Sequence, residues 1–159
     1  MNAKEKNARA LFANGYNCAQ AVLGAFCEDD GLEVNAALKL ASGFGGGLRC
    51  GEVCGAVSGA IMVIGLKCGF YIENDLQQKN FCYQKTYEFI ETFKKEKSSI
   101  LCRELLGVDI RAPEDHFTPE ARARHKTVCP ELVAATRYKC AALTSSFGTP
   151  FPCSYSWPK

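Results

Sequence analysis

The chain has 159 residues, a formal net charge of +2 and an apolar fraction of 47%. This length fits a single domain, and the composition can support a hydrophobic core. No cluster of Lys and Arg stands out, so we expect no nucleic-acid partner. The N-terminal segment has no apolar h-region, and the longest apolar run falls well short of the roughly twenty residues that span a membrane. We therefore expect a cytoplasmic protein with no membrane partner.

The first part of the chain predicts three short helices. Residues 4–13 form an amphipathic segment, which Asn14-Gly15 ends with a helix-stop signal. Asn17 and Gln20 have the spacing of a capping box, which places Cys18 at the first position of the second helix. A third helix over residues 36–41 leads into a glycine cluster.

The stretch 43–69 has the strongest pattern in the chain. It begins with the glycine cluster at residues 45–47, and an apolar segment over residues 56–66 follows. Gly55 and Gly59 recur at helical spacing, so a neighbouring helix backbone can approach closely there. We expect this helix at the centre of an all-α, single-domain multi-helix bundle.

The second half of the chain predicts further helices. Residues 75–97 form a long one, and Ser98-Ser99 begins a short one that Gly107 closes. Thr118-Pro119-Glu120 and Cys129-Pro130-Glu131 each combine a cap with a proline at the first helical position. The repeated signal predicts two separate helices, of which the second begins at Cys129 and ends near Leu143.

The last residues are rich in proline and aromatic side chains, which is unsuitable for regular helix. We expect a helical domain over residues 1–143 and an extended C-terminal strap, residues 144–159, packed on it.

Ten cysteines are unusual for a chain of this size. In a cytoplasmic protein they indicate metal binding, redox chemistry or buried small side chains. Four of them are predicted at or near helix starts, where free N–H groups and the helix dipole lower a thiol pKa. These four are the candidate catalytic residues, and we expect them to form one cluster: Cys18, Cys54, Cys102 and Cys129. For each, a buried structural role is the alternative.

The other cysteines carry weaker signals. Cys50 precedes Cys54 by four residues, which is not the spacing of thioredoxin-like or zinc-ribbon sites. We expect five further cysteines to be buried core residues, namely Cys27, Cys68, Cys82, Cys140 and Cys153.

The chain has two histidines, His116 and His125. His125 lies in a basic run and is expected at the surface, with a mixed zinc site shared with Cys129 as the alternative. The glycine cluster lacks the Gly-Lys-Ser/Thr of a phosphate-binding loop.

Four segments together resemble the C_GCAxxG_C_C family of redox-active proteins. They are Gly15–Val22, Cys54–Gly59, Cys102–Gly107 and Cys129-Pro130, and the resemblance covers roughly residues 5–143. The family label writes its core as GCA, where this chain has Cys-Gly-Ala. The resemblance implies redox activity carried by the cysteines, and it singles out the four that the capping pattern also selects.

Three functions follow from these observations. The first is a thiol redox protein in which Cys54 is the low-pKa nucleophile and another cluster cysteine resolves its disulfide. The second uses the same four residues, Cys18, Cys54, Cys102 and Cys129, as ligands of zinc or an iron–sulfur cluster. The third is a structural or interaction module. A redox partner protein, a small-molecule substrate and a homodimer all remain open.

Overall fold

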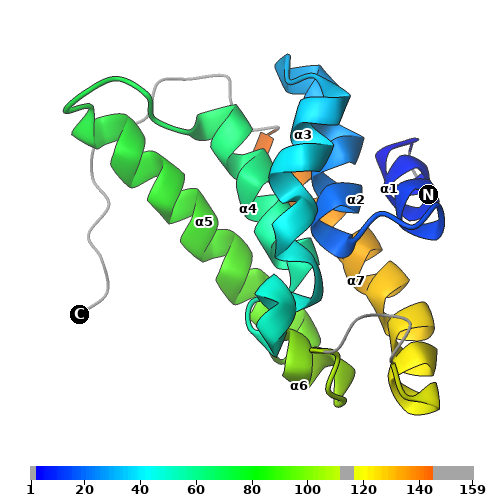
Figure 1. Ribbon diagram of the computed structural model, residues 1–159. Helices are drawn as coiled ribbons and strands as arrows, with labels where there is room; N and C mark the ends of the chain where they lie inside the picture. Colours follow the sequence, from blue (N-terminus) through cyan, green and yellow to red (C-terminus); the bar gives the residue numbers. More distant parts are fainter. Residues whose placement is uncertain (1–2, 112–116, 145–159) are drawn as a thin grey trace.

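The computed structural model describes residues 3–111 and 117–144, with side chains as far as residue 136 in the second range. Regular structure in these residues is helical, apart from one isolated bridge between Val53 and Leu101. This confirms the all-α prediction (Figure 1). The α-helices are α1 (Ala3–Ala13), α2 (Cys18–Phe26), α3 (Val34–Ala41), α4 (Gly55–Cys68), α5 (Leu76–Lys97), α6 (Cys102–Leu106) and α7 (Pro119–Thr144).

Helix α4 lies in the middle of the bundle, with α5 on one side and α2 on the other (Figure 1). Its sequence is apolar on nearly every face, and both Val57 and Val63 are fully buried. A helix that is apolar all round is stable only when other helices surround it. The predicted central helix is therefore confirmed, two residues longer at its C-terminal end than the apolar run.

Several helix boundaries follow the local signals. The Asn17 side chain accepts hydrogen bonds from the backbone N–H groups of Ala19 and Gln20, and the Gln20 side chain accepts from the Asn17 N–H. The predicted capping box is thus present. Asp75 likewise caps α5 by accepting from the Gln78 N–H.

The expected helix start at Ser98-Ser99 is wrong. Ser98 ends α5 in the left-handed conformation, with φ of 69°. Ser99 accepts a hydrogen bond from the Leu101 N–H, and α6 begins only at Cys102. The chain between the two helices is extended because it pairs with residues 52–54, as described below.

The two separate helices predicted after residue 118 are also wrong. Helix α7 runs without a break from Pro119 to Thr144 and contains Pro130 in its interior. Proline there removes one helical hydrogen bond and costs about 3 kcal/mol. Ala121, before the proline, and Leu132 and Val133, after it, are all buried in the same core. We attribute the continuity of the helix to this shared packing, which outweighs the local penalty.

Helices α1 and α7 are joined by a two-pronged ion pair. The Arg9 guanidinium donates to both carboxylate oxygens of Glu131, at 2.9 and 3.1 Å.

In the parts of the chain that the structure describes, no helix is long and apolar enough to cross a membrane. Of the expected C-terminal strap, residues 144–159, Thr144 is the last residue of α7, and residues 145–159 with Cys153 lie outside the described residues. His116 and the side chain of Cys140 lie outside them as well.

Candidate functional site

The four selected cysteines meet around one buried cavity of about 20 Å³. This volume is enough for about one water molecule. Cys18, Cys54, Cys102 and Cys129 are each no more than 6% exposed. The structure therefore brings together in space four residues that come from four separate segments of the chain.

Cys18 is the first residue of α2, and α4 packs closely against it. The capping box holds it as the first residue of its helix. A Cβ atom at Gly55, the first residue of α4, would lie 3.2 Å from the Cβ atom of Cys18. Any side chain at that position would press against Cys18, so glycine there allows the starts of the two helices to meet.

Cys54 and Cys102 are positioned by a short antiparallel pairing. The Cys54 N–H donates to the Ile100 carbonyl at 2.8 Å, and the Cys102 N–H donates to the Glu52 carbonyl at 2.7 Å. The Val53–Leu101 bridge lies between these two bonds. Both cysteines are therefore fixed by backbone contacts at the points where α4 and α6 begin.

Cys129 lies in the interior of α7 and is not a cap residue, which corrects the prediction. It faces the core, where it is 3% exposed. The Arg124 side chain donates to the carbonyl of Leu106 at 2.8 Å and ties α7 to the end of α6. Cys129 thus reaches the cavity from the side of a helix.

The glycine cluster forms a left-handed turn beside the cavity. Gly46, Gly47, Leu48 and Arg49 all have φ between 58° and 62°. This conformation costs residues other than glycine about 1–2 kcal/mol each. A Cβ atom at Gly47 would lie 2.8 Å from that of Cys102, so the turn packs directly on the cluster.

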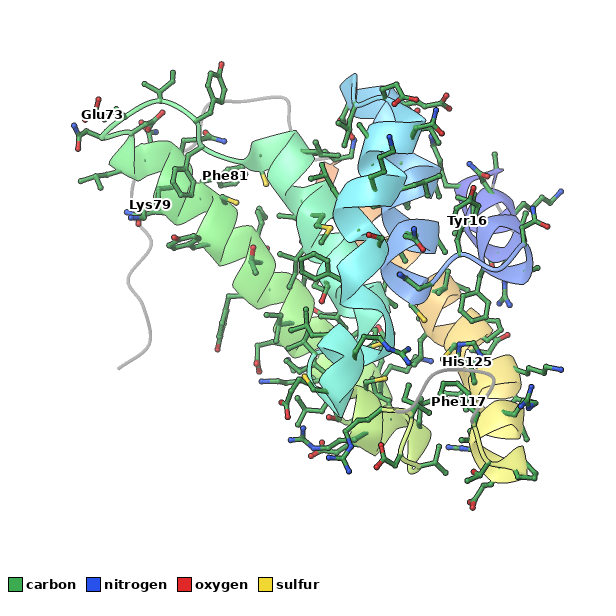
Figure 2. All side chains as sticks on the ribbon, viewed as in Figure 1. Tyr16, Glu73, Lys79, Phe81, Phe117 and His125 are labelled. Atoms are coloured by element: carbon green, nitrogen blue, oxygen red, sulfur yellow. The ribbon has the colours of Figure 1, made fainter. Side chains whose placement is uncertain are left out.

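This turn brings Arg49 to the wall of the cysteine cavity. His125 lines the same wall, between the rings of Phe12 and Phe117 at centroid distances of 5.3 and 5.8 Å. Figure 2 shows His125 and Phe117 side by side at the start of α7. The histidine expected at the surface is thus half-buried at the site, because aromatic rings on both sides cover it.

Sequence reasoning missed Arg49 as a residue of the site. Its position depends on the left-handed turn. The three consecutive glycines indicate a turn, but they do not predict its handedness or that Arg49 would line the cavity.

Burial and contacts between the thiols raise the thiol pKa values of the cluster. A side-chain hydrogen bond with Cys129 is the main cause that raises the pKa of Cys18, and burial adds to it. Burial also raises the pKa of Cys54 to about 11. The N–H groups of Ala56 and Val57, in the first turn of α4, oppose this rise, although the sulfur makes no cap hydrogen bond of ordinary geometry.

Burial likewise raises the pKa of Cys102 to about 12, and the neighbouring thiols add to the rise. The positive charge of Arg49 acts in the opposite direction. The prediction of depressed thiol pKa values at helix starts is therefore wrong for Cys18, Cys54 and Cys102. Removing a thiolate from water outweighs the N–H groups and the dipole of a helix end.

Outside the cluster, Cys27, Cys68 and Cys82 are buried, as expected for core residues. Cys68 and Cys82 form a second thiol pair between α4 and α5, which the sequence did not indicate. Burial is the main cause that raises the pKa of Cys68 to about 12, and Cys82 adds to it by charge and by a hydrogen bond. Cys50, in contrast, is exposed.

The arrangement of the side chains provides no support for the hypothesis that the four cysteines bind zinc or an iron–sulfur cluster. Among the described residues, no three His, Cys, Asp or Glu side chains are arranged to hold a metal ion. His125 and Cys129 line one cavity, but with no such group around them the mixed zinc site gains no support.

Comparison with known protein families identifies the family of this chain. The family model described as "Putative redox-active protein (C_GCAxxG_C_C)" matches residues 16–143. The chain belongs to this family. The match begins beside Cys18 and extends past Cys129, so all four cavity cysteines of this C_GCAxxG_C_C protein fall within it. No curated protein and no solved structure was found to match the chain.

Proposed function

We propose that this C_GCAxxG_C_C protein is a thiol–disulfide redox protein whose working dithiol is Cys18 and Cys129. The observation that carries the proposal is the contact between these two thiols inside a cavity that four cysteines share. Cys129 is the main influence that raises the pKa of the Cys18 thiol, so the two thiols are neighbours in this cavity, as a disulfide requires. The family description supports redox activity in general.

The chemistry is a two-electron exchange with an external disulfide. The Cys18 and Cys129 thiols lose two protons and two electrons and form one S–S bond. The external disulfide takes up both electrons and both protons and leaves as two thiols. In this scheme Cys54 passes the exchange on to the Cys18–Cys129 pair inside the cavity, where the N–H groups of Ala56 and Val57 partly offset the cost of its buried thiolate.

The raised thiol pKa values suit a protein that stays reduced until a reactant reaches the cavity. Only the thiolate attacks a disulfide, and a thiol with a pKa of about 11 is almost entirely protonated at neutral pH. Cys54 is 1% exposed, which keeps bulk oxidants away from it.

Thiol mapping at controlled redox potential tests the proposal. The reduced protein is equilibrated with mixtures of 2-mercaptoethanol and its disulfide, hydroxyethyl disulfide; free thiols are then blocked with N-ethylmaleimide, and linked peptides are identified by mass spectrometry. We expect a Cys18–Cys129 disulfide with a reduction potential between roughly −300 and −120 mV, the range of cellular dithiol proteins. Cys18→Ser and Cys129→Ser should each abolish it.

Cys68→Ser is the matched control, because it removes one thiol of the buried pair outside the cluster. It should leave the Cys18–Cys129 disulfide unchanged. Circular dichroism of each variant distinguishes lost chemistry from lost folding. A cluster that stays reduced across this range, or stoichiometric zinc or iron bound by the purified protein and lost in Cys18→Ser, would overturn the proposal.

A further inference from the structure

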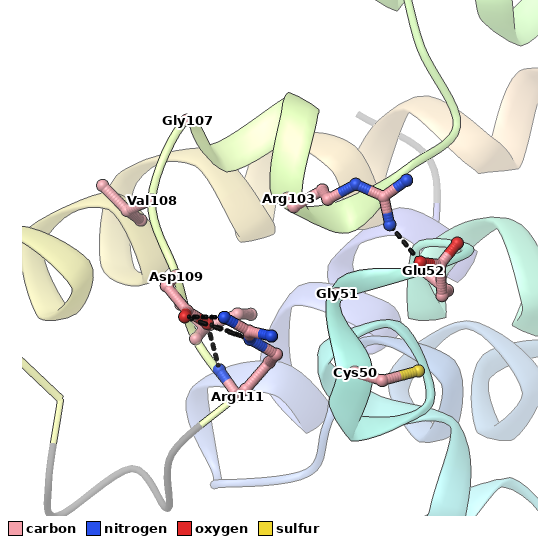
Figure 3. A pocket seen from close by; sticks show the side chains of 9 residues that line it. Cys50, Gly51, Glu52, Arg103, Gly107, Val108, Asp109 and Arg111 are labelled. Carbon is pink, nitrogen blue, oxygen red and sulfur yellow. Dashed lines mark hydrogen bonds and ion pairs between the residues drawn. The ribbon is translucent and has the colours of Figure 1, made fainter.

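A second and larger hollow lies beside the cysteine cavity. It is an open groove of about 530 Å³, and its walls come from residues 50–52, the start of α6 and the segment 107–111 (Figure 3). This volume is within the range of small-molecule sites. Ile110 lines both the groove and the cysteine cavity, so a single buried side chain contributes to the wall between them.

An exposed cysteine, Cys50, is one of the residues that line this groove. Of the cysteines whose side chains the structure describes, Cys50 alone is exposed. Its S–H donates to the Gly47 carbonyl at 3.3 Å, within the left-handed turn. Arg111 lies near Cys50: the pKa of its guanidinium is raised mainly by the hydrogen bond to Asp109 and to a smaller extent by Cys50.

The rim of the groove carries two charges of each sign. Arg103 pairs with Glu52, and the Arg111 guanidinium donates hydrogen bonds to both oxygens of the Asp109 carboxylate, at 2.6 to 3.0 Å (Figure 3). All four side chains are about half exposed or more. A ligand with both ammonium and carboxylate groups can exchange with either pair and leave no charge unmatched.

The left-handed turn connects the groove with the cluster. Arg49 of this turn lines the cysteine cavity, whereas the next residue, Cys50, lines the groove. Leu48 and Arg49 hold a strained left-handed conformation, so a change of this turn relieves strain at both residues. Only three residues separate Cys50 from Cys54, and a relaxed turn can bring the two to disulfide distance.

We propose that this groove binds a small zwitterionic peptide disulfide of the oxidised-glutathione class, and that Cys50 is the thiol that attacks it. The inference rests on the proposed dithiol chemistry of the cluster and names its substrate class.

The exchange balances in three steps. The Cys50 thiolate attacks one sulfur of the disulfide, forms a mixed disulfide and releases the first peptide thiol, which takes the Cys50 proton. Cys54 then gives up its proton and attacks the Cys50 sulfur, which releases the second peptide thiol with that proton. The Cys18–Cys129 pair finally reduces the Cys50–Cys54 disulfide, so that both thiols are restored and the cluster holds the disulfide.

Rapid-quench thiol mapping with oxidised glutathione tests the proposal on the full chain. We expect the first glutathione adduct on Cys50, and at least a tenfold slower formation of the cluster disulfide in Cys50→Ser. Cys82→Ser serves as control, because it removes a buried thiol away from the groove, and it should react at the wild-type rate. Circular dichroism checks that each variant is folded.

A comparison of a charged and an uncharged disulfide tests whether the groove prefers a zwitterionic substrate. Arg103→Gln should slow the reaction with oxidised glutathione at least threefold and leave the reaction with uncharged hydroxyethyl disulfide within twofold. Lys39→Gln makes the same charge change on the exposed surface of α3 and should alter neither rate. Equal effects of Arg103→Gln on both reagents, or none, would overturn the substrate class.

The outcomes distinguish this inference from the proposed function. If Cys50→Ser forms the cluster disulfide as fast as the wild type, Cys50 is not the attacking thiol, while the dithiol chemistry stands. If Cys50 is glutathionylated but the cluster forms no disulfide even with excess hydroxyethyl disulfide, the proposed function fails, and the proposed transfer from Cys50 through Cys54 fails with it.

Discussion

A Cβ atom built on Gly59 would lie 2.8 Å from the carbonyl oxygen of Ala19. Helices α2 and α4 therefore cross almost backbone to backbone at this point. The same close approach continues to Gly55 and Cys18, at the starts of the two helices. The small residues of α4 thus set the distance that places Cys18 and Cys54 around one cavity.

Gly59→Ala should destabilise the protein by about 1–3 kcal/mol, because the new methyl group would press on the rigid backbone of α2. Gly65→Ala is the matched control in the same helix, since a Cβ atom there meets nothing within 4 Å. It should be neutral or stabilise by up to about 1 kcal/mol. Denaturant unfolding followed by circular dichroism gives both values, and equal effects would contradict the close crossing.

Alkaline pH should destabilise the fold through its buried thiols. Burial raises the pKa of Cys54 from 9.0 to about 11 and that of Cys102 from 9.0 to about 12. Above pH 9 the unfolded chain releases these protons while the folded protein still holds them, so stability falls as pH rises to about 11–12. Melting temperatures at pH 7 and pH 10 measure the loss.

The control for this pH effect is Cys54→Ala, in which one of the buried thiols is absent. Its melting temperature should fall less between pH 7 and pH 10 than that of the wild type. A fall of the same size in both proteins would show that other groups cause the alkaline destabilisation.

Leu48→Gly should not destabilise the protein, although it removes a large apolar side chain. Leu48 is 47% exposed and has φ of 59°, which glycine adopts without strain. Relief of about 1–2 kcal/mol offsets the greater chain entropy of glycine. Leu40→Gly, at an exposed leucine of α3, should instead cost about 1 kcal/mol. Unfolding curves showing the same loss for both would argue against strain in the turn.

Pro130→Ala should stabilise α7 by up to about 3 kcal/mol, because alanine restores the backbone N–H that proline lacks. We expect the same change to slow formation of the Cys18–Cys129 disulfide, since Cys129 directly precedes the proline, where the helix lacks one backbone hydrogen bond. Pro119→Ala, at the first residue of α7, is the control and should change stability little. A Pro130→Ala protein with unchanged stability and oxidation rate would show that the proline is incidental.

The sequence alone determined those features that depend on near neighbours in the chain. The apolar run 56–66 required a buried helix, and Asn17 with Gln20 required a helix start at Cys18, because hydrophobic burial and capping act over a few residues. The family motifs singled out Cys18, Cys54, Cys102 and Cys129 as a set. The central helix, the capping box and the family are confirmed.

The tertiary structure alone decided how those cysteines behave. Burial reversed the expected direction of the thiol pKa shifts, because the cost of desolvating a thiolate depends on what surrounds it. Helix α7 continues past Pro130 because residues on both sides of the proline pack in the same core, although Cys129-Pro130 locally favours a helix boundary. The pairing of Cys18 with Cys129 and the place of Arg49 at the cavity depend on contacts between segments far apart in the sequence. Such contacts are set by the whole fold, and no local pattern records them.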